Sequence, residues 1–568
     1  MLINRFSSLL LSFVFIVFLS SCTPSVELPD EEDINDEYVE SSGYHIKFHI
    51  EKQNIKGFGV EIQSDAFGPR YDYTDPVKGI PLGIPHDLIP SERKRLATEL
   101  ASGFRYLRLA MGLWFRGVTD DQKNFVERYP GQLEMLKELM EDANMEGISL
   151  EYWSPAPYWK STYGLLGGTL RSYDDAFLDE FGDALARDVQ YFIDNGVKVS
   201  VWGLQNEPFN GDGDYPQCYY TDENYFKTFK AVAPKIRAVS PEIEIIVDTK
   251  NANFGAIGNM LRNDPEALQY VDSWVYHRPG QNSDHCIEAA ERLLREPMGR
   301  PIYQNEWSYH GEQMQAWSEE YRMVNLAQSI MNWMTFIDSP SWYWLHMLKS
   351  TQDGSRFGFG LGIFRPKEDI NFSIHPEIPA GTFKYHWPNY NGIAGFMKYM
   401  ERDSRRIHVE EDTVRYDQRI MCWRNPDGKY AFALTNRSEE KFDFVIHLDK
   451  ERSFSGRRYS RDFVDYALPS VSGDSIYTIR LEPWSIEFWT EDNVSSSIQS
   501  SEDISMFNVK RIGDNFHIEG IAKREQIKMY HLNGQLYKQV TADSDIMLIP
   551  MHSNDLILIK AGKNTYKI

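Results

Sequence analysis

The sequence predicts an α/β protein in which a (β/α)8 barrel is followed by an antiparallel β-sandwich. Between residues 57 and 395, short apolar runs alternate with amphipathic helical stretches, which is the pattern of parallel βα units. After residue 396 the helical period disappears and β alternation returns, as at Phe442, Phe444, Ile446 and Leu448, which is typical of half-buried antiparallel strands. The 568 residues, 42% of them hydrophobic, are enough for more than one core.

Eight apolar runs are expected to form the strands of the barrel. They are Phe58–Ile62, Tyr106–Leu109, Ile148–Tyr152, Val199–Leu204, Ile243–Val247, Val271–Tyr276, Pro301–Tyr303 and Ser341–Leu345. One intervening helix is marked by apolar residues at three- and four-residue steps from Phe177 to Phe192, and Asn195-Gly196 supplies its stop. An open doubly wound sheet is the alternative, which is disfavoured because no GxGxxG or P-loop run follows the first strand.

Both ends of the chain add further β-structure. Residues 44–56 begin with a strictly alternating stretch, and we expect this strand to complete the side β-sandwich of residues 396–492, because alone it would expose an unpaired edge. A serine-rich linker at 493–504 leads to a small β domain at 505–568, with a hairpin signal at Asn533-Gly534. Its segment IKMYHLNGQLYKQV resembles the C-terminal sorting domains of Bacteroidetes secreted proteins.

The N-terminus indicates export. An apolar run with Arg5 before it ends at Leu19-Ser20-Ser21-Cys22, and this resembles a bacterial lipoprotein signal peptide at 1–21, with lipid on Cys22. A buried N-terminal helix is the alternative. The acidic residues 22–43 predict a flexible tether and resemble the signal that sends Bacteroidetes-type lipoproteins to the outer face of the outer membrane. The membrane contact is expected through the lipid only.

Charge and cysteines exclude several classes of function. The formal net charge of −23 has the wrong sign for a surface that binds nucleic acid. The four cysteines form no CxxC and no Cys/His cluster at zinc spacing, so we expect no metal site and no cofactor. Beyond Cys22 three cysteines remain, an odd number, so at least one is free within the chain. The 14 tryptophans fit a protein that stacks flat sugar faces or, equally, a well-filled core.

Two expected strands end in an acidic motif. The fourth leads into Gln205-Asn206-Glu207-Pro208 and the seventh into Gln304-Asn305-Glu306-Trp307. The carboxyl ends of barrel strands meet at one face, where active sites lie. Hydrolysis of a glycosidic bond needs one carboxyl group as proton donor and a second as nucleophile or stabilising anion. We therefore predict Glu207 and Glu306 as a catalytic pair, although a solvated surface carboxylate is the alternative for either one alone.

These motifs resemble clan A glycoside hydrolases, and glycoside hydrolase family 30 most of all. The resemblance covers about residues 44–492. Its motifs are Gly57-Phe58-Gly59, Trp153-Ser154-Pro155-Ala156-Pro157-Tyr158-Trp159, the Asn-Glu-Pro at 206–208 and Tyr215-Pro216-Gln217-Cys218-Tyr219-Tyr220-Thr221. Gly59-Val60-Glu61-Ile62 and Asn305-Glu306 depart from the family pattern, which leaves the subfamily and the sugar open.

The resemblance implies a retaining, double-displacement mechanism with Glu207 as acid/base and Glu306 as nucleophile, which requires carboxyl groups about 5 to 5.5 Å apart. It places Arg108 against the nucleophile, with an ordinary ion pair as the alternative, and Asn206 on the sugar 2-hydroxyl. Either Tyr276 or His277 would contact the nucleophile.

Trp153, Trp159 and Trp344 are candidates for sugar stacking or for packing. The predicted function is hydrolysis of a β-linked polysaccharide, with xylan ahead of β-1,6-glucan and β-1,6-galactan. A non-catalytic glycan-binding lipoprotein is the competing hypothesis. A peptidase is disfavoured because the sequence has no HExxH and no GxSxG with a companion histidine.

Overall fold

The computed structural model describes most of residues 40–492 and the strands of a C-terminal unit. The described ranges are 40–62, 88–128, 130–209, 216–248, 255–277, 282–288, 290, 299–309, 316–351, 359–367, 376–492, 508–512, 515–519, 526–531, 536–544, 546–550, 557–561 and 564–567. The chain divides between residues 492 and 493 into two compact units, which are described separately. The predicted signal peptide, Cys22 and most of the acidic tether lie outside the described residues.

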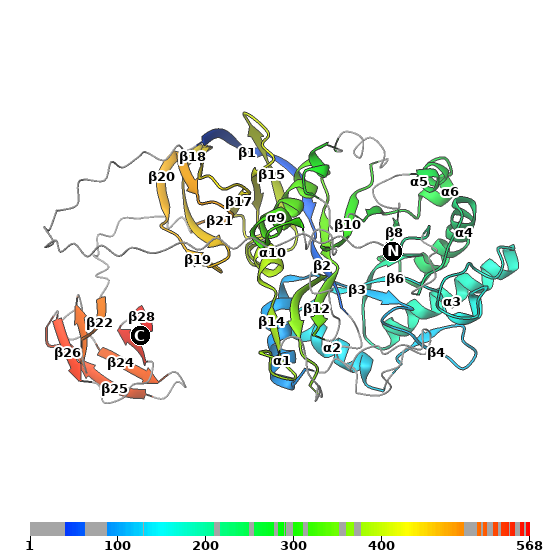
Figure 1. The fold of residues 1–568 in the computed structure, drawn as a ribbon, viewed down its shortest axis with the longest axis horizontal. Coiled ribbons are helices and arrows are strands. Elements are labelled where there is room, and N and C mark those ends of the chain that lie inside the picture. The colour runs from blue at the N-terminus through cyan, green and yellow to red at the C-terminus, as the bar shows by residue number, and fades with distance from the viewer. Residues whose placement is uncertain are drawn as a thin grey trace, which may run out of the picture. The chain divides into compact units, whose positions relative to one another are not determined.

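Eight parallel strands close into a barrel, as predicted, and each contains part of one expected run (Figure 1). They are β2 (Gly57–Glu61), β3 (Tyr106–Met111), β6 (Gly147–Tyr152), β7 (Val199–Gly203), β8 (Glu244–Asp248), β9 (Ser273–Tyr276), β10 (Ile302–Trp307) and β11 (Ser341–Trp344). The seventh strand is longer than expected, so Glu306 lies on β10 itself rather than after it. The doubly wound alternative is therefore wrong, because β11 pairs with β2 and closes the sheet.

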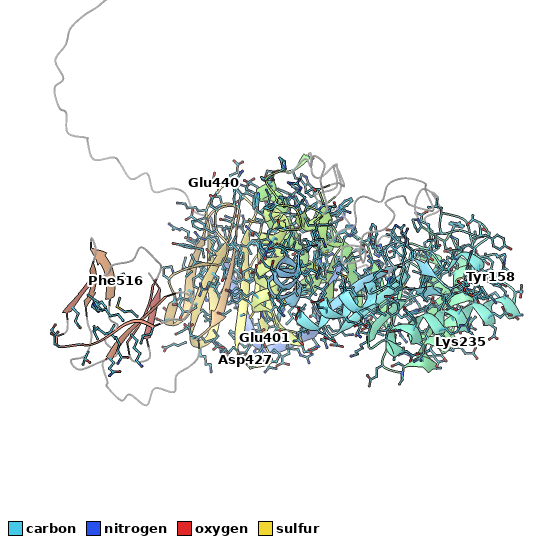
Figure 2. The ribbon with its side chains drawn as sticks, turned by 90° about the horizontal axis from the view of Figure 1, so that it is seen from below. Tyr158, Lys235, Glu401, Asp427, Glu440 and Phe516 are labelled. Carbon is cyan, nitrogen blue, oxygen red and sulfur yellow. The ribbon has the colours of Figure 1, made fainter. Side chains whose placement is uncertain are left out.

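Helices follow the strands and cover the outside of the barrel. They are α1 (Pro90–Arg95), which continues as a π-turn (Leu96–Leu100) and a 3-10 turn (Ala101–Gly103), α2 (Gln132–Asp142), a 3-10 turn (Pro157–Trp159), α3 (Asp175–Asp194), α4 (Asp222–Val239), α5 (Gly255–Arg262), α6 (Pro265–Leu268), α9 (Glu319–Phe336) and α10 (Trp387–Tyr399). Helix α3 is the predicted amphipathic helix. Asp174 caps it by accepting from the amide of Phe177 at 2.9 Å. Lys235 of α4 (Figure 2) pairs with Asp179 and Asp183 of α3 at 2.7 and 2.5 Å.

The barrel interior explains one glycine of the opening Gly-Phe-Gly. A Cβ added to Gly59 would lie 2.5 Å from the ring of Tyr343 on β11, the neighbouring strand. Any side chain at position 59 would therefore displace that ring. Val201, Ile246, Val275 and Tyr303 form a separate small apolar cluster, whereas the residues that alternate with them, such as Trp274 and Tyr276, belong to the larger core.

The last barrel strand leads into an inserted three-stranded sheet. It consists of β12 (His346–Ser350), β13 (Gly360–Phe364) and β14 (Phe383–Tyr385). Strand β12 starts two residues after β11 ends, and the insertion therefore begins at the carboxyl edge of the barrel. A second small addition, the hairpin of β4 (Gly117–Val118) and β5 (Phe125–Val126), follows β3.

The sandwich is built from both ends of the barrel, as predicted. Its strands are β1 (Glu40–Ile55), β15 (Ser404–Glu411), β16 (Gln418–Arg424), β17 (Tyr430–Asn436), β18 (Phe442–Tyr459), β19 (Tyr466–Ala467), β20 (Val471–Leu481) and β21 (Ser485–Glu491). The N-terminal β1 pairs antiparallel with β15 and parallel with β18. Both of its edges are thus occupied, which removes the open edge that an isolated strand would present.

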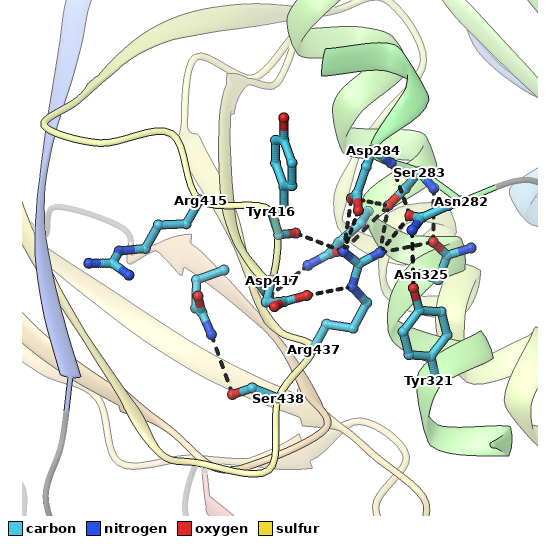
Figure 3. Close-up of polar contacts among 12 residues, drawn as sticks. Asn282, Ser283, Asp284, Tyr321, Asn325, Arg415, Tyr416, Asp417, Arg437 and Ser438 are labelled. Carbon is cyan, nitrogen blue, oxygen red and sulfur yellow. Dashed lines mark hydrogen bonds and ion pairs between the residues drawn. The ribbon is translucent and has the colours of Figure 1, made fainter. Parts of the chain in front are cut away.

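A buried arginine joins the sandwich to the barrel (Figure 3). Arg437, just after β17, donates to both carboxylate oxygens of Asp284 at 2.8 and 3.0 Å. It also donates to Asn282 at 2.9 Å and to Asn325 of α9 at 3.1 Å. Residues 282–284 follow β9 in the chain, so this one side chain of the sandwich fixes a segment beyond the sixth barrel strand.

The C-terminal unit consists of two small antiparallel sheets. One contains β22 (Asn508–Ile512), β23 (Asn515–Glu519) and β26 (Ile546–Pro550), and the other contains β24 (Gln526–His531), β25 (Leu536–Thr541), β27 (Ile557–Ala561) and β28 (Asn564–Lys567). Phe516 and Ile518 of the first sheet, and Ile527 and Met529 of the second, are buried at alternate positions. Strands β24 and β25 pair antiparallel on either side of the predicted Asn533-Gly534 turn, which itself lies outside the described residues.

The cysteines and the apolar character of the helices bear on two expectations from the sequence. Cys218, Cys286 and Cys422 are all buried free thiols. Among the described helices, none is both long and apolar enough to cross a membrane.

Candidate active site

The carboxyl edge of the barrel collects the predicted polar residues. Arg108 lies on β3, Asn206 and Glu207 follow β7, His277 follows β9, and Glu306 lies near the end of β10. The strands are parallel and the barrel is closed, so these strand ends meet at one mouth.

The two predicted carboxylates face each other. One oxygen of Glu207, one oxygen of Glu306 and a ring nitrogen of His277 all lie within 4.8 Å of one another. His277 Nδ1 is 3.1 Å from Oε1 of Glu207 and 3.8 Å from Oε2 of Glu306. The His277 side chain is fully buried, whereas the side chains of Glu207 and Glu306 remain 23% and 13% exposed. Solvent or a ligand can therefore reach both carboxylates from the mouth.

Glu207 has an unusual backbone. Its φ of 44° lies in the left-handed region, which residues with a side chain rarely adopt. A backbone hydrogen bond holds the segment that follows: the Tyr220 amide donates to the Pro208 carbonyl at 2.8 Å. Such backbone strain persists only where the surrounding structure enforces it, and it gathers at functional sites. The Asn-Glu-Pro motif thus has a conformational role as well as a chemical one.

Arg108 connects most of the site. Its guanidinium donates to Glu306 Oε2 at 2.5 Å, to Glu151 Oε2 at 2.5 Å and to Asn206 Oδ1 at 2.7 Å. Although burial lowers the pKa of Arg108, the surrounding carboxylates raise it above its ordinary value, so this group remains a cation. Arg108 therefore lies in direct contact with Glu306, the position that the family resemblance implied, and supplies a positive charge there.

Asn206 is oriented by two hydrogen bonds. Its backbone N–H donates to the carbonyl of Tyr152 at 2.7 Å, and its side-chain oxygen accepts from Arg108. The side-chain oxygen is thus engaged, which leaves the side-chain NH2 as the group that Asn206 can offer to a ligand.

The structure selects His277 over Tyr276 as the residue against the carboxylates. Tyr276 is the last residue of β9 and belongs to the large apolar core outside the barrel, whereas the next residue, His277, lies beside Glu207 and Glu306. Neighbouring residues of an extended strand point to opposite faces, so only one of the two can reach the mouth.

The three candidate tryptophans have different environments. Trp153 lies under the site, with the Arg108 guanidinium 4.6 Å from its ring centre. Trp159 is 1% exposed and packs at 5.4 Å against Phe177 and Phe181 of α3. Trp344 is fully buried and donates through its indole nitrogen to the carbonyl of Phe359 at 2.8 Å. Of the two alternatives left open for Trp159 and Trp344, stacking or packing, the burial of both rings favours packing.

Sequence reasoning missed a second group of residues next to Arg108. Glu61, the last residue of β2, lies 3.5 Å from Arg108 Nη1 and accepts the indole N–H of Trp114 at 2.8 Å. His346, from the insertion after β11, has its Nδ1 3.1 Å from the same carboxylate. Burial raises the pKa of Glu61 to about 7, against the attraction of Arg108. The only signal in the sequence was the departure from the family pattern at 59–62.

Glu151 and Trp114 complete this group. Glu151, on β6, is buried and accepts from the side-chain amide of Asn305 at 2.9 Å as well as from Arg108. Asn305 was the other departure from the family pattern, so the two departures concern residues that contact the same cluster. Trp114 is only half-buried and packs edge-on against His346 at 6.2 Å. It therefore has a partly exposed aromatic ring after β3, which Trp159 and Trp344 do not have.

The two predicted carboxylates and the histidine beside them could also be considered as a metal site. Glu207, His277 and Glu306 offer three ligand atoms close enough to share one cation. Arg108, however, already supplies a positive charge to Glu306 at 2.5 Å, which an added cation would have to oppose. The arrangement fits a pair of acid groups facing one bond better than a metal centre.

Comparison with known proteins finds the same fold in glycoside hydrolases. No family model and no curated protein matches the sequence. A family 30, subfamily 8 xylanase from Clostridium acetobutylicum superimposes with a TM-score of 0.58, covering 79% of this chain and 99% of its own at 16% identity. An endo-β1,6-glucanase has a TM-score of 0.58, with 80% and 93% covered at 17% identity. An α-L-arabinofuranosidase from Thermotoga maritima has a TM-score of 0.52, with 79% and 100% covered at 12% identity.

These neighbours share an architecture but differ in their sugars and linkages. At such identities the likeness concerns the fold, and it spans nearly the whole length of each neighbour. The chain thus has the same fold as these glycoside hydrolases.

Proposed function

We propose that this protein is a retaining glycoside hydrolase that cleaves a β-linked polysaccharide, with Glu207 as acid/base and Glu306 as nucleophile. The observation that supports this most directly is the pair of partly exposed carboxylates at the barrel mouth, with Arg108 bonded to only one of them. The neighbouring folds belong to glycosidases, which favours the same class of reaction here. A binding protein has no chemical need for such an asymmetric pair.

In the proposed mechanism each carboxylate has a distinct role in the first step. Glu306, which contacts Arg108, attacks the anomeric carbon as an anion and forms a glycosyl ester. Glu207 transfers its proton to the departing glycosidic oxygen, which takes the electron pair of the broken bond. The nearby negative charge of Glu306 favours the protonated form of Glu207 before this step.

The second step reverses the proton flow. Glu207 is a carboxylate once it has given up its proton, and because the ester removes the charge of Glu306, Glu207 stays ionised and can accept a proton from water. That water attacks the anomeric carbon and expels Glu306, so two inversions give net retention. One oxygen of Glu207 lies within 4.8 Å of one oxygen of Glu306, which is closer than the separation of about 6.5 to 9.5 Å in inverting enzymes and favours retention.

Xylan is the first candidate substrate, followed by β-1,6-glucan and β-1,6-galactan. Structural neighbours include xylanases and an endo-β1,6-glucanase, so both of the leading choices occur on this fold. The full chain in mild detergent, incubated with each glycan, identifies the substrate, and proton NMR of the first product shows whether the new anomer is retained.

Glutamine variants test the catalytic pair. Glu207→Gln and Glu306→Gln are expected to lose product release by a factor of about 10³ or more, since each removes a group that acts at the reacting atoms. Glu244→Gln is the matched control, because Glu244 lies at the amino edge of the barrel and pairs with Lys56 at 2.6 Å. Firm binding of one glycan without hydrolysis, unchanged in both variants, would instead establish the non-catalytic binding protein.

We also propose that the chain is anchored in the outer membrane by lipid on Cys22. The residues Leu19-Ser20-Ser21-Cys22 after an apolar run support this, as does the acidic stretch that follows them. Metabolic labelling with a radioactive fatty acid should mark the wild-type chain and not Cys22→Ser. Labelling of both chains, or of neither, would contradict the anchor.

A further inference from the structure

Glu61 and Glu151 bring two carboxylates more than the double displacement needs. Three carboxylates surround the single guanidinium of Arg108: Glu306 at 2.5 Å, Glu151 at 2.5 Å and Glu61 at 3.5 Å. The side chains of Glu61 and Glu151 are each 1% exposed. Glu61 and Glu151 are buried and share the guanidinium with Glu306, and a net buried charge is costly, so the cluster favours retaining a proton.

Other charged and titratable groups also face Glu61 and bear on where that proton resides. His346 Nδ1 lies 3.1 Å from Glu61, and Lys349 of β12 exerts an attraction on it. Glu151 repels it, and Arg108 attracts it. Burial has the largest effect and raises the pKa of Glu61 to about 7. Burial therefore moves the ionisation of Glu61 toward neutral pH.

Glu61 is also fixed to the wall of the site. Its Oε1 accepts the N–H of the half-buried Trp114 at 2.8 Å, and Trp114 packs edge-on against His346. The residue thus contacts the aromatic wall on one side and, through Arg108, the nucleophile on the other.

We propose that Glu61 is a positioning residue that holds Trp114 at the sugar pocket and, when ionised, adds negative charge beside Arg108 and the nucleophile. This inference rests on the proposed hydrolysis. Negative charge near the pocket stabilises the positive charge that develops on the sugar ring in the transition state. The same charge makes Glu207 hold its proton to higher pH, which extends activity on the alkaline side.

Glu61→Gln tests this role, because glutamine keeps the shape and can still accept from Trp114. In the full chain, kcat/KM of the variant should match the wild type below about pH 6, where Glu61 is already neutral. Its alkaline limb should lie about 0.5 to 1 pH unit lower than in the wild type, the size expected for one charge acting at an effective dielectric constant of about 20. Coincident profiles, or an equal loss at every pH, would overturn the inference.

Glu487→Gln is a matched control from the sandwich. Glu487 is also buried, accepts the indole N–H of Trp489 at 3.0 Å and pairs with Arg458 at 2.7 Å, and burial raises its pKa as well. It reproduces the local chemistry of Glu61 away from the site. Its pH–activity profile should coincide with that of the wild type.

Thermal melting supplies a readout that does not need activity. When the pKa of a carboxyl group is higher in the folded than in the unfolded chain, the protein loses stability as pH rises between the two values. The melting temperature of Glu61→Gln, relative to wild type, should therefore rise by about 2 to 4 °C from pH 5 to pH 8. No such rise would overturn the assignment of the proton to Glu61. If the wild type hydrolyses no glycan, the proposed function fails and the positioning role falls with it, whereas activity with coincident profiles removes only the role of Glu61.

Discussion

The Nη1 atom of Arg108 lies 2.5 Å from Oε2 of Glu306. His277 lies closer to the other carboxylate, because its Nδ1 is 3.1 Å from Glu207 and 3.8 Å from Glu306. Arg108 thus contacts one carboxylate of the pair and His277 contacts the other. This asymmetry supports the proposed roles of nucleophile and proton donor, because a bonded guanidinium favours the anion.

We expect Arg108→Lys to lower kcat by about 100- to 1,000-fold, the range observed when one preorganised electrostatic partner is removed from an active site. Lysine keeps the positive charge but cannot contact Glu306, Glu151 and Asn206 together. Steady-state kinetics on the identified glycan measures the effect. Arg105→Lys is the control, since Arg105 lies just before β3 at the opposite edge of the barrel and pairs with Glu146 and Asp403. Equal losses in both variants would argue against a special role for Arg108.

Trp114 and Trp159 should respond differently to replacement by leucine. Trp114→Leu is expected to raise KM by about tenfold, because it removes the half-exposed ring at the pocket wall. Trp159→Leu should leave KM unchanged and cost about 2 to 4 kcal/mol of stability, since its ring is packed against α3. Kinetics and denaturant unfolding of the two variants separate these effects. A rise in KM for Trp159→Leu would restore it as a stacking residue.

Arg437→Met should weaken both the fold and the catalysis. It leaves Asp284 buried without its bidentate partner, which costs about 3 to 5 kcal/mol. The segment 282–284 follows His277 in the chain, so kcat is expected to fall as well. The double variant Arg437→Met, Asp284→Asn should recover part of the lost stability, because no buried charge is then left unpaired. Unfolding in denaturant that shows additive losses would contradict the pairing as the source of the stability.

Asp188 should make stability depend on pH. It is fully buried and accepts from Asn124, the amide of Phe125 and Tyr152 at 2.8, 2.9 and 3.0 Å. Burial nevertheless raises its pKa to about 7, so the folded chain binds this proton more tightly than the unfolded chain does. Stability is therefore lost as pH rises from about 4 to 7. Relative to wild type, Asp188→Asn should gain about 2 to 4 kcal/mol of stability from pH 5 to pH 8, measured by denaturant unfolding. A constant difference across this range would show that Asp188 is ionised throughout.

The periodicity of the sequence was sufficient to predict the barrel and the origin of the sandwich. Apolar runs such as Val199–Leu204 have the length of a buried strand, and the period of Phe177 to Phe192 admits only a helix. The strand ends could be located to within a few residues, which placed Glu207 and Glu306 at one mouth. The end of β10 was missed because Gln304, Asn305 and Glu306 are polar, although they continue the strand.

The sequence by itself determined the type of fold and the pair of carboxylates, because both follow from local patterns along single strands. Only the tertiary structure decided which side chains face the pocket. It assigned His277 rather than Tyr276, buried Trp159 and Trp344, and brought Glu61, Trp114 and His346 together from three separate segments. Such contacts depend on strand register and on the closure of the barrel, and these relate residues that are far apart in the chain.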